Sequence, residues 1–369
     1  MRNKTLFISN MYPGKKNPSF GVFVKNQIDL LNAKGVKGDN IVISDDKSGK
    51  FNVLKKYGVW FAKSLYSLLF NYKKYNLVHA HYVFPSGLIA LLFKKVRNIP
   101  YVVTAHGGDI DRMPYKNKVI FMITEKILKE ADAVIAVGEK LKEDIVKNFH
   151  IDSNNIYVLN MGVNRDVFIP FDQDQMRKQL GLATDTKRLL FVGNIIRAKG
   201  IDELIKAFAN LKKSFDDLQL DIIGAQKDPQ YIQEVHNLIE RLDVEDISIH
   251  PPKGQKEIAS WMAAADAFIL PSHIEGFGLV ALEALSTNTP VVGSDVGGLS
   301  YLLRNDVGIL VEPKSEDSLK EGIKKILESD KIKTMLIKNG ENKAEEFDQE
   351  VIIQSIVNIY KNIEERHYE

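Results

Sequence analysis

The sequence contains no cysteine among its 369 residues. This absence excludes disulfide bonds, thiolate metal sites and cysteine nucleophiles, and it fits a reducing compartment. No apolar run reaches the roughly 18 residues that a membrane-spanning helix needs. The apolar run that begins at Thr5 is too short for a signal peptide and predicts a first β-strand instead. We therefore expect a cytoplasmic protein.

A dinucleotide fingerprint is also missing. The turn expected after the first strand, Pro13 to Gly21, has glycines but no G-x-G-x-x-G pattern, which argues against a nicotinamide-type site there. Lys15 and Lys16 make this turn a candidate wall for a phosphorylated acceptor, and an ordinary solvated loop is the alternative.

The charges are distributed unevenly along the chain. At 44% hydrophobic and 27% charged residues the composition is that of an ordinary globular protein, and the length predicts two domains. The net charge of +2 combines +12 in residues 1–170 (26 basic, 14 acidic) with −10 in the remainder (24 basic, 34 acidic). Such an asymmetry predicts that the N-terminal half faces an anionic partner, and a lysine-rich solvated surface is the alternative.

Short apolar strands alternate with amphipathic helices twice over. Because both faces of such strands must be covered by helices, this order predicts an α/β protein with two doubly wound parallel sheets. In the first half the expected strands are Thr5–Ser9, Ile41–Ser44, Leu77–His81, Tyr101–Ala105, Ala133–Val137 and Ile156–Leu159, and two of the expected helices are Val22–Ala33 and Asn117–Glu130. In the second half the expected strands are 188–193, 220–224, 247–250, 267–270, 290–293 and 308–311.

The alternation lapses into proline and polar residues around 166–175, which places a domain boundary there. We expect an N-terminal domain of residues 1–168 and a C-terminal domain of residues 169–348. A last helix, about 349–369, has an apolar face and is expected to pack back on the first domain. Two such domains place a ligand crevice at the carboxyl ends of both sheets.

The most informative segment is Glu275-Gly-Phe-Gly-Leu-Val-Ala-Leu-Glu283, which follows the expected strand 267–270. A helix that starts after Gly278 places Glu283 on its second turn and leaves Glu275 in the loop before it. The N–H groups of Gly276, Phe277, Gly278, Leu279 and Val280 are then available to phosphate oxygens. An anion site flanked by two carboxylates that accept sugar hydroxyls suits a nucleotide sugar.

A second loop carries basic residues to the same sheet edge. Strand 188–193 ends at Gly193 and is followed by Asn194, Arg197, Lys199 and Gly200 before the next helix. Arg197 and Lys199 can neutralise a departing diphosphate.

Histidines follow two strands of the first half. His106 and Asp109 lie in Thr104-Ala-His-Gly-Gly-Asp109, at the carboxyl end of strand 101–105, where α/β folds keep their chemistry. His79 and His81 share one face of their strand, a spacing that zinc could use, but no third ligand is evident. We favour a packing or acceptor-side role for this pair.

Residues 53–74 predict an amphipathic helix with five lysines. Its helically spaced apolar residues predict a face packed on the sheet: Leu54, Tyr57, Phe61, Leu65, Leu68 and Tyr72. The alternative uses the aromatics off that face, Trp60, Tyr66 and Phe70, which with the lysines could rest on an anionic membrane surface.

Taken together, these motifs resemble the retaining glycosyltransferases of family 4, which have the GT-B fold of two Rossmann-like domains facing a central cleft. The resemblance covers most of the chain, from the segment ending at Gly21 to Gly297-Gly298, and the Glu-x7-Glu signature is its most specific part.

The resemblance implies roles for individual residues. Lys199 would hold the donor diphosphate, Glu283 the ribose hydroxyls, and Glu275 the transferred sugar in a pocket that includes residues 276–278. His106 would lie at the reacting centre from the other domain, with Gly21, His81 and Asp109 on the acceptor side.

One position departs from the family. Asn194 stands where the family usually has arginine, and Arg197 is the candidate replacement. The family usually needs no bound metal, so we expect no cofactor.

We therefore expect transfer of a sugar, with anomeric retention, from a UDP- or GDP-linked donor to a saccharide acceptor, lipid-phosphate-linked as in bacterial surface polysaccharide synthesis. The protein would lie peripherally on the inner face of the plasma membrane and bind no nucleic acid. The alternatives are a sugar-nucleotide epimerase of the same architecture and a non-catalytic carbohydrate-binding protein.

Overall fold

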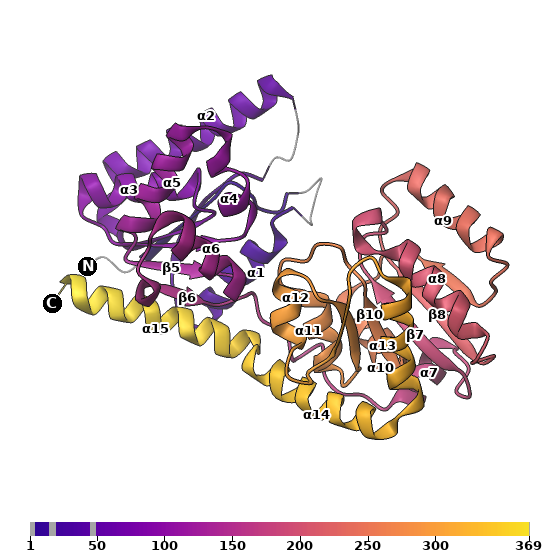
Figure 1. Ribbon diagram of the computed structural model, residues 1–369. Coiled ribbons are helices and arrows are strands. Elements are labelled where there is room, and N and C mark those ends of the chain that lie inside the picture. The colour runs from indigo at the N-terminus through magenta and orange to yellow at the C-terminus, as the bar shows by residue number, and fades with distance from the viewer. Residues whose placement is uncertain (1–3, 15–19, 45–48, 369) are drawn as a thin grey trace. The chain divides into compact units, whose positions relative to one another are not determined.

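The computed structural model describes residues 4–14, 20–44 and 49–368. The chain forms two compact units, one made of residues 1–161 with 350–369 and the other of residues 162–349 (Figure 1). Each unit contains a six-stranded sheet whose paired strands are all parallel, so the predicted α/β class with two parallel sheets is confirmed.

In the first unit the strand order is β2-β1-β3-β4-β5-β6. The strands are β1 (Lys4–Ser9), β2 (Gly38–Val42), β3 (Tyr75–His81), β4 (Tyr101–Ala105), β5 (Ala133–Ala136) and β6 (Ile156–Val158). The α-helices are α1 (Val22–Ala33), α2 (Lys50–Tyr66), α3 (Ser86–Arg97), α4 (Gly108–Asp111), α5 (Lys118–Glu130), α6 (Glu139–Phe149) and α15 (Gln349–Tyr368). Every residue of β4 and β5 is buried, as a sheet covered on both faces requires.

In the second unit the strand order is β12-β11-β10-β7-β8-β9. The strands are β7 (Lys187–Val192), β8 (Leu218–Ile223), β9 (Ile247–His250), β10 (Ala267–Leu270), β11 (Val291–Ser294) and β12 (Ile309–Val311). The α-helices are α7 (Gln173–Leu180), α8 (Ile201–Lys212), α9 (Pro229–Arg241), α10 (Gln255–Ala264), α11 (Leu279–Ser286), α12 (Gly297–Leu303), α13 (Glu316–Glu328) and α14 (Asp330–Glu346).

Strand order reverses beside the first strand of each unit. β1 pairs with β2 on one side and β3 on the other, and β7 pairs likewise with β8 and β10. The loops that leave the two central strands at such a point diverge and open a crevice at their carboxyl ends. The loop after β7 carries Lys199, the loop after β10 carries Glu275, and β3 ends at His81.

Local signals gave several element boundaries correctly. Helix α1 has the predicted bounds, and α5 begins one residue after Asn117, whose side chain accepts a hydrogen bond from the Ile120 N–H at 2.9 Å. Strand β2, in contrast, starts at Gly38 rather than Ile41 because Gly38 pairs with Thr5 of β1. A Cβ at Gly38 would lie 2.3 Å from the Phe7 ring, so glycine lets the strand lie this close to that ring.

The predicted packing face of residues 53–74 is wrong for three of its members. Leu54, Phe61 and Leu65 are exposed, with 75% of the Leu54 surface accessible, although Leu68 is buried as predicted. The aromatic side chain that packs inward is instead Trp60, which is 4% exposed and donates from Nε1 to the Ile41 carbonyl at 3.0 Å. After Tyr66 the helix continues as a π-turn, η1 (Ser67–Asn71), and a 3₁₀ turn, η2 (Tyr72–Lys74).

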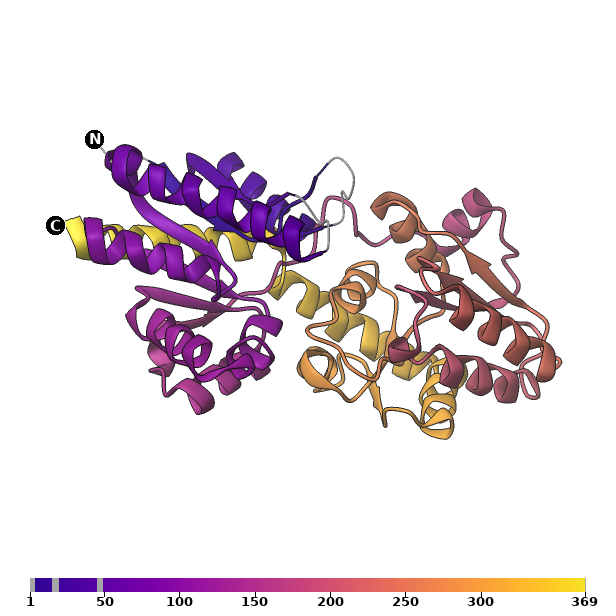
Figure 2. The same cartoon turned by 90° about the horizontal axis from the view of Figure 1, so that it is seen from above.

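The segment 162–168 packs in the second unit, whereas the sequence pattern places the boundary after residue 168. Val163 and Phe168 belong to the apolar core of that unit, and the Val163 N–H donates to the Phe347 carbonyl at 2.8 Å. At the other end of the chain, α15 runs alongside the first unit in both views (Figures 1 and 2). Its buried residues include Ile356 and Tyr360.

Candidate functional site

The loop after β7 is held in place by the loop after β10. It forms a short 3₁₀ turn, η5 (Arg197–Lys199), and passes into α8 through Gly200 at φ +70°. A Cβ at Gly200 would lie 2.0 Å from the Pro271 carbonyl oxygen, and the His273 N–H donates to the Ala198 carbonyl at 2.9 Å. These contacts between the two loops therefore fix the position of Lys199.

Lys199 and Glu275 contact each other directly. The Lys199 ammonium lies 2.6 Å from Glu275 Oε2, and both side chains are largely buried. The Ser272 hydroxyl donates to the same oxygen at 3.3 Å, and the Gly276 N–H donates to Oε1 at 3.3 Å. The pair places one positive and one negative group at the carboxyl ends of β7 and β10, where the strand order of the second sheet reverses.

Helix α11 begins next to this pair. Gly278 adopts φ +85° as its N-cap, and the N–H groups of Phe277, Gly278, Leu279 and Val280 have no acceptor within the described residues. These groups carry the positive end of the helix dipole and are suited to an anion. Beneath them, a Cβ at Gly298 would lie 2.0 Å from the Gly276 carbonyl oxygen, so the glycine pair at the start of α12 permits this close approach.

Glu283 projects from the second turn of α11, as predicted from its spacing. Burial raises the pKa of its carboxyl to about 7, because desolvation disfavours the charged form. Its side chain has no hydrogen-bond or ion-pair partner within the described part of the chain. A partly buried carboxyl without a partner is suited to accept hydrogen bonds from ligand hydroxyls.

Arg197 and Asn194 differ from Lys199 in their surroundings. The Arg197 guanidinium pairs with Asp202 at 3.0 Å and with Glu234 of α9, and it lies over the Tyr231 ring at 4.9 Å. Its side chain is 60% exposed, and Asn194 is also exposed. The structure therefore brings together Lys199, Glu275 and the α11 N-terminus, while Arg197 points toward α9.

In the first unit, His106 lies against His81, which in turn packs against His79. Its Nε2 is 3.3 Å from Nδ1 of His81, and its ring packs on Phe23 of α1 at 5.1 Å and on Tyr82 at 4.5 Å. Gly21, at φ +67°, lets α1 begin against Met11, where a Cβ would lie 2.6 Å from the Met11 carbonyl carbon. His106 is half-buried, whereas His81 is fully buried.

Desolvation keeps this cluster neutral. It lowers the pKa of His81 to about 3 and lowers the pKa values of His79 and His106 well below the ordinary value. Asp109 is buried and accepts from the Val83 N–H at 2.7 Å and the His106 N–H at 2.9 Å. Burial raises the pKa of Asp109 to about 6, against the opposing effect of these backbone hydrogen bonds. Asp109 thus holds the loop that carries His106.

Sequence reasoning missed one member of this cluster. Nδ1 of His79 lies 2.5 Å from the hydroxyl of Tyr360 on α15, and Nε2 lies 2.7 Å from the Thr104 hydroxyl. Tyr360 looks like one more apolar position of the last helix, and no local pattern links it to a histidine 281 residues earlier. Within the described ranges, no three His, Asp or Glu side chains gather as metal ligands. Lys15 and Lys16 lie outside the described residues.

Across the described residues, none of the helices combines the length and the apolar character of a membrane span.

Two family models match consecutive parts of the sequence. The model described as Glycosyltransferase Family 4 matches residues 31–167, and the model described as Glycosyl transferases group 1 matches residues 172–343.

Among curated proteins, a putative teichuronic acid biosynthesis glycosyltransferase, TuaC of Bacillus subtilis, is 28% identical over 358 residues, which cover 87% of this chain and 88% of TuaC. A D-inositol 3-phosphate glycosyltransferase of Geodermatophilus obscurus is 31% identical over 303 residues, covering 78% of this chain and 66% of the relative.

Solved structures share the fold. A glycosyltransferase from Rickettsia africae superimposes with a TM-score of 0.79 at 20% identity, covering 98% of this chain and 99% of that structure. Anabaena HepE, solved in complex with UDP, gives 0.77 at 19% identity, with 97% and 100% covered. At these identities the likeness establishes the two-domain architecture.

Proposed function

The chain belongs to the family 4 glycosyltransferases of GT-B fold, and on this premise we propose that it transfers a sugar from a UDP- or GDP-linked donor to a saccharide hydroxyl with anomeric retention. The observation that carries the proposal is the juxtaposition of Lys199, Glu275 and the α11 N-terminus, with the unpartnered carboxyl of Glu283 one turn further on. HepE, a protein of the same fold, was solved with UDP, which supports a nucleotide donor.

Each of these groups matches one part of a nucleotide sugar. The diphosphate would take the free N–H groups at the start of α11 and draw Lys199 away from Glu275. Glu275, released from that pair, would accept hydrogen bonds from the transferred sugar. Glu283 would accept them from the ribose hydroxyls. Lys199 and the helix N-terminus would supply the positive charge that the departing diphosphate needs, so the proposal requires no metal ion.

In the proposed reaction the bond between the sugar C1 and the diphosphate oxygen breaks, and its electron pair leaves with the diphosphate. The acceptor oxygen forms its bond to C1 on the same face. The acceptor's proton passes to the phosphate oxygen that has just left, so atoms and charges balance. The neutral imidazole of His106 would accept or donate a hydrogen bond at this centre.

We further propose that the acceptor is lipid-phosphate-linked and that the first unit rests on the inner face of the membrane. Nine large apolar side chains of α2 and η1 are exposed: Phe51, Val53, Leu54, Val59, Phe61, Leu65, Tyr66, Leu69 and Phe70. Residues 50–74 also contain six lysines and no acidic residue. An apolar face with a basic margin is typical of segments that lie on anionic bilayers.

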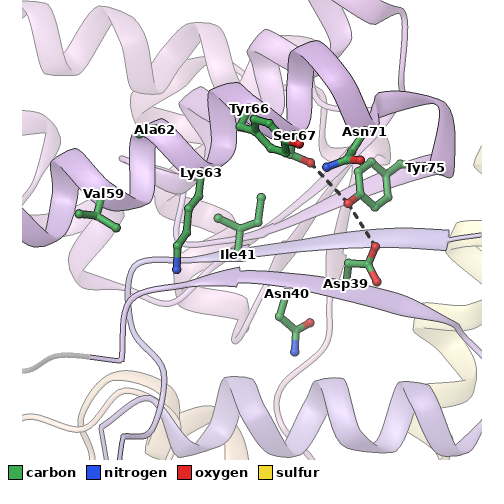
Figure 3. Close-up of a pocket in the computed structure, with 10 residues that line it drawn as sticks. All are labelled: Asp39, Asn40, Ile41, Val59, Ala62, Lys63, Tyr66, Ser67, Asn71 and Tyr75. Atoms are coloured by element: carbon green, nitrogen blue, oxygen red, sulfur yellow. Dashed lines mark hydrogen bonds between the residues drawn. The ribbon is translucent and has the colours of Figure 1, made fainter.

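Next to these exposed side chains, a cavity of about 480 Å³ lies between helix α2 and strand β2 (Figure 3). Its apolar lining comes from Ile41, Val59, Ala62 and Tyr66. At its inner end the Tyr75 hydroxyl accepts from Ser67 at 3.4 Å and donates to Asp39 at 3.2 Å.

The kind of product is suggested by a relative. TuaC is named as a putative glycosyltransferase of teichuronic acid biosynthesis, which supports a polysaccharide product.

A thermal-shift screen with UDP-glucose, UDP-N-acetylglucosamine, UDP-glucuronic acid and GDP-mannose tests the donor proposal. Ligand at 100 times its dissociation constant should add about 2.7 kcal/mol of stability. Lys199→Ala and Glu275→Ala should abolish that shift and sugar release, whereas Lys213→Ala, which removes an exposed lysine beyond the end of α8, should leave both unchanged. No shift with any of these ligands would refute the proposal.

The reaction type needs two further measurements on the selected donor. NMR should show that the sugar, when it is first released from the donor, has the anomeric configuration that it had in the donor, because retention is proposed. Accumulation of an epimeric nucleotide sugar without an acceptor would identify an epimerase instead.

Sedimentation with vesicles of phosphatidylglycerol and phosphatidylcholine tests the membrane proposal. The double change Leu54→Ser with Phe70→Ser should weaken binding about ten-fold or more. The matched control, Val119→Ser with Met122→Ser, removes two exposed apolar side chains from α5 and should bind as the wild type does. Equal binding by both variants would refute the α2 surface as the membrane contact.

A further inference from the structure

The hydroxyl of Tyr360 makes a specific contact with His79, a buried histidine of the first unit. His79 and Tyr360 are both buried, and the 2.5 Å distance from the Tyr360 hydroxyl to His79 Nδ1 is that of a strong hydrogen bond. The opposite ring nitrogen of His79 contacts the Thr104 hydroxyl at 2.7 Å. Both nitrogens of one neutral imidazole are therefore engaged, one as donor and one as acceptor.

The direction of these hydrogen bonds follows from donor strength. A phenol is a better hydrogen-bond donor than an aliphatic hydroxyl, and the Tyr360 hydroxyl has no other acceptor within the described residues. We therefore assign Tyr360 as the donor to Nδ1, which places the His79 proton on Nε2, directed at Thr104. The phenol thus selects one of the two neutral tautomers.

His79 is connected to His106 through His81. The His79 and His81 rings lie on one face of β3 with their centroids 4.5 Å apart, tilted by 30°. His81 Nδ1 in turn lies 3.3 Å from His106 Nε2. Because the three rings are close-packed and neutral, reorientation of the His79 ring would displace the His81 ring. Within the described residues, the only contact of a His81 ring nitrogen is with His106.

We propose that Tyr360 and His79 are positioning residues: the hydroxyl on α15 fixes the tautomer and orientation of His79, and through His81 it fixes the imidazole of His106 at the reacting centre. This inference rests on the proposed function, since it assumes that His106 contacts the reacting groups. It gives the last helix, which enters the first unit after the whole second unit, a part in catalysis besides packing.

The helix is anchored independently of Tyr360, so the hydroxyl can be removed by itself. The Tyr368 hydroxyl donates to the Asn76 carbonyl at 2.9 Å, the Asn76 amide donates to Glu364 at 2.6 Å, and His367 contacts the Asn98 carbonyl at 2.9 Å. Tyr360→Phe deletes one oxygen, and Tyr368→Phe on the same helix is its matched control.

The first measurement is turnover of the nucleotide sugar selected by the thermal-shift screen. Tyr360→Phe should lower kcat about ten-fold or more, since a small misplacement of a reacting group is enough for such a loss. The KM for the donor should stay unchanged, because the proposed donor groups lie in the second unit. Tyr368→Phe should retain wild-type kcat. A wild-type kcat in Tyr360→Phe would overturn the inference.

A double-mutant cycle separates positioning from general destabilisation. If Tyr360 acts through His106, the variant with both Tyr360→Phe and His106→Ala should be no slower than His106→Ala alone. If the double variant instead shows the product of the two single-variant losses in kcat, the inference is overturned. Wild-type activity in His106→Ala would instead show that the proposed role of His106 is wrong, which keeps the two failures distinct.

The tautomers themselves can be read by ¹⁵N–¹H NMR of histidine-labelled protein. The His79 signals, assigned with a His79→Asn variant, should show the Nε2–H tautomer in the wild type. In Tyr360→Phe we expect a changed or mixed tautomer of His79 together with shifted His106 signals. Unmoved His106 signals would overturn the inference even if stability fell.

Discussion

Glu283→Gln should stabilise the unliganded protein above neutral pH while it weakens donor binding. The change keeps the shape of the side chain and removes its charge. In the folded chain the carboxyl is desolvated, its pKa is raised to about 7 from the ordinary 4.5, and no cation or donor of the described residues compensates for the charge. Ionising this carboxyl therefore destabilises the fold.

The sign and size follow from linkage. A carboxyl whose pKa is higher in the folded than in the unfolded state contributes stability that is fully present below the unfolded value of 4.5 and is lost as the pH rises through about 7. At 1.36 kcal/mol for each pH unit between the two pKa values, the loss at pH 8 is about 3 kcal/mol. At pH 5 it is less than about 1 kcal/mol. Glutamine does not titrate and avoids this loss.

Thermal unfolding of the wild type and of Glu283→Gln at pH 5 and pH 8 tests this expectation. For a unit of this size a gain of about 3 kcal/mol raises the Tm by roughly 6–12 °C at pH 8, whereas at pH 5 a gain of less than about 1 kcal/mol should raise it by less than roughly 4 °C. The control is Glu245→Gln, which neutralises an exposed carboxylate and should leave the Tm unchanged at both pH values. An equal Tm shift at both pH values would refute the desolvation argument.

Donor affinity should move in the opposite direction. If Glu283 accepts the ribose hydroxyls, the affinity for UDP-glucose, or for the GDP sugar if the screen selects one, should rise with pH between 6 and 8 as the carboxyl ionises. A nucleotide sugar has no ionisation of its own phosphates in this range, so the change reports on the protein. Glu283→Gln should bind more weakly and without this pH dependence. A wild-type affinity in the variant would show that Glu283 is not a donor ligand.

Three further predictions follow from the structure. Gly200→Ala should cost about 2–4 kcal/mol of unfolding free energy, because the added Cβ clashes with a carbonyl oxygen at φ +70°, whereas Gly181→Ala at φ +69° has open space and should cost about 1 kcal/mol in urea unfolding; equal costs would contradict the clash. His81 has a pKa of about 3 when folded, below its ordinary 6.5, so its contribution is present above pH 6.5 and is lost as the pH falls. His81→Asn should therefore remove about 2 kcal/mol of the stability loss between pH 7 and pH 5, and an unchanged loss would argue against burial of a neutral imidazole. Because two surface carboxylates already pair with Arg197, Arg197→Ala should weaken donor binding less than Lys199→Ala does, as measured by calorimetry; the reverse order would show that Arg197 turns toward the diphosphate.

Most of the architecture could be predicted from local patterns. Strands such as β4 are short, mainly apolar and β-branched runs, and both β4 and α1 have the predicted bounds. The spacing from Glu275 to Glu283 placed one carboxylate before a helix and the other on its second turn, because helical periodicity depends on neighbours in sequence only. Glycines also indicated the loops of the candidate site, such as Gly200 in the loop after β7, where the backbone lies too close to another segment for a side chain.

Side-chain surroundings could not be predicted in the same way. The face that residues 53–74 present to the sheet differs from the predicted stripe: Trp60 is buried, while Leu54 and Phe61 are exposed. Both faces of that helix are apolar, so its pattern could not select the one that packs inward. Sequence reasoning likewise expected Arg197 to face the phosphate, yet in the structure it pairs with Asp202 and Glu234.

The sequence by itself determined the order of strands and helices, the glycines that let loops approach one another, and the two carboxylates and the lysine that characterise the family, since each depends on residues close together in the chain. Only the tertiary structure decided that Lys199 contacts Glu275, that the carboxyl of Glu283 loses its water, and that Tyr360 reaches His79. Those outcomes depend on which distant elements pack together, because desolvation and hydrogen bonding act over a few ångströms of space, whatever the separation along the chain.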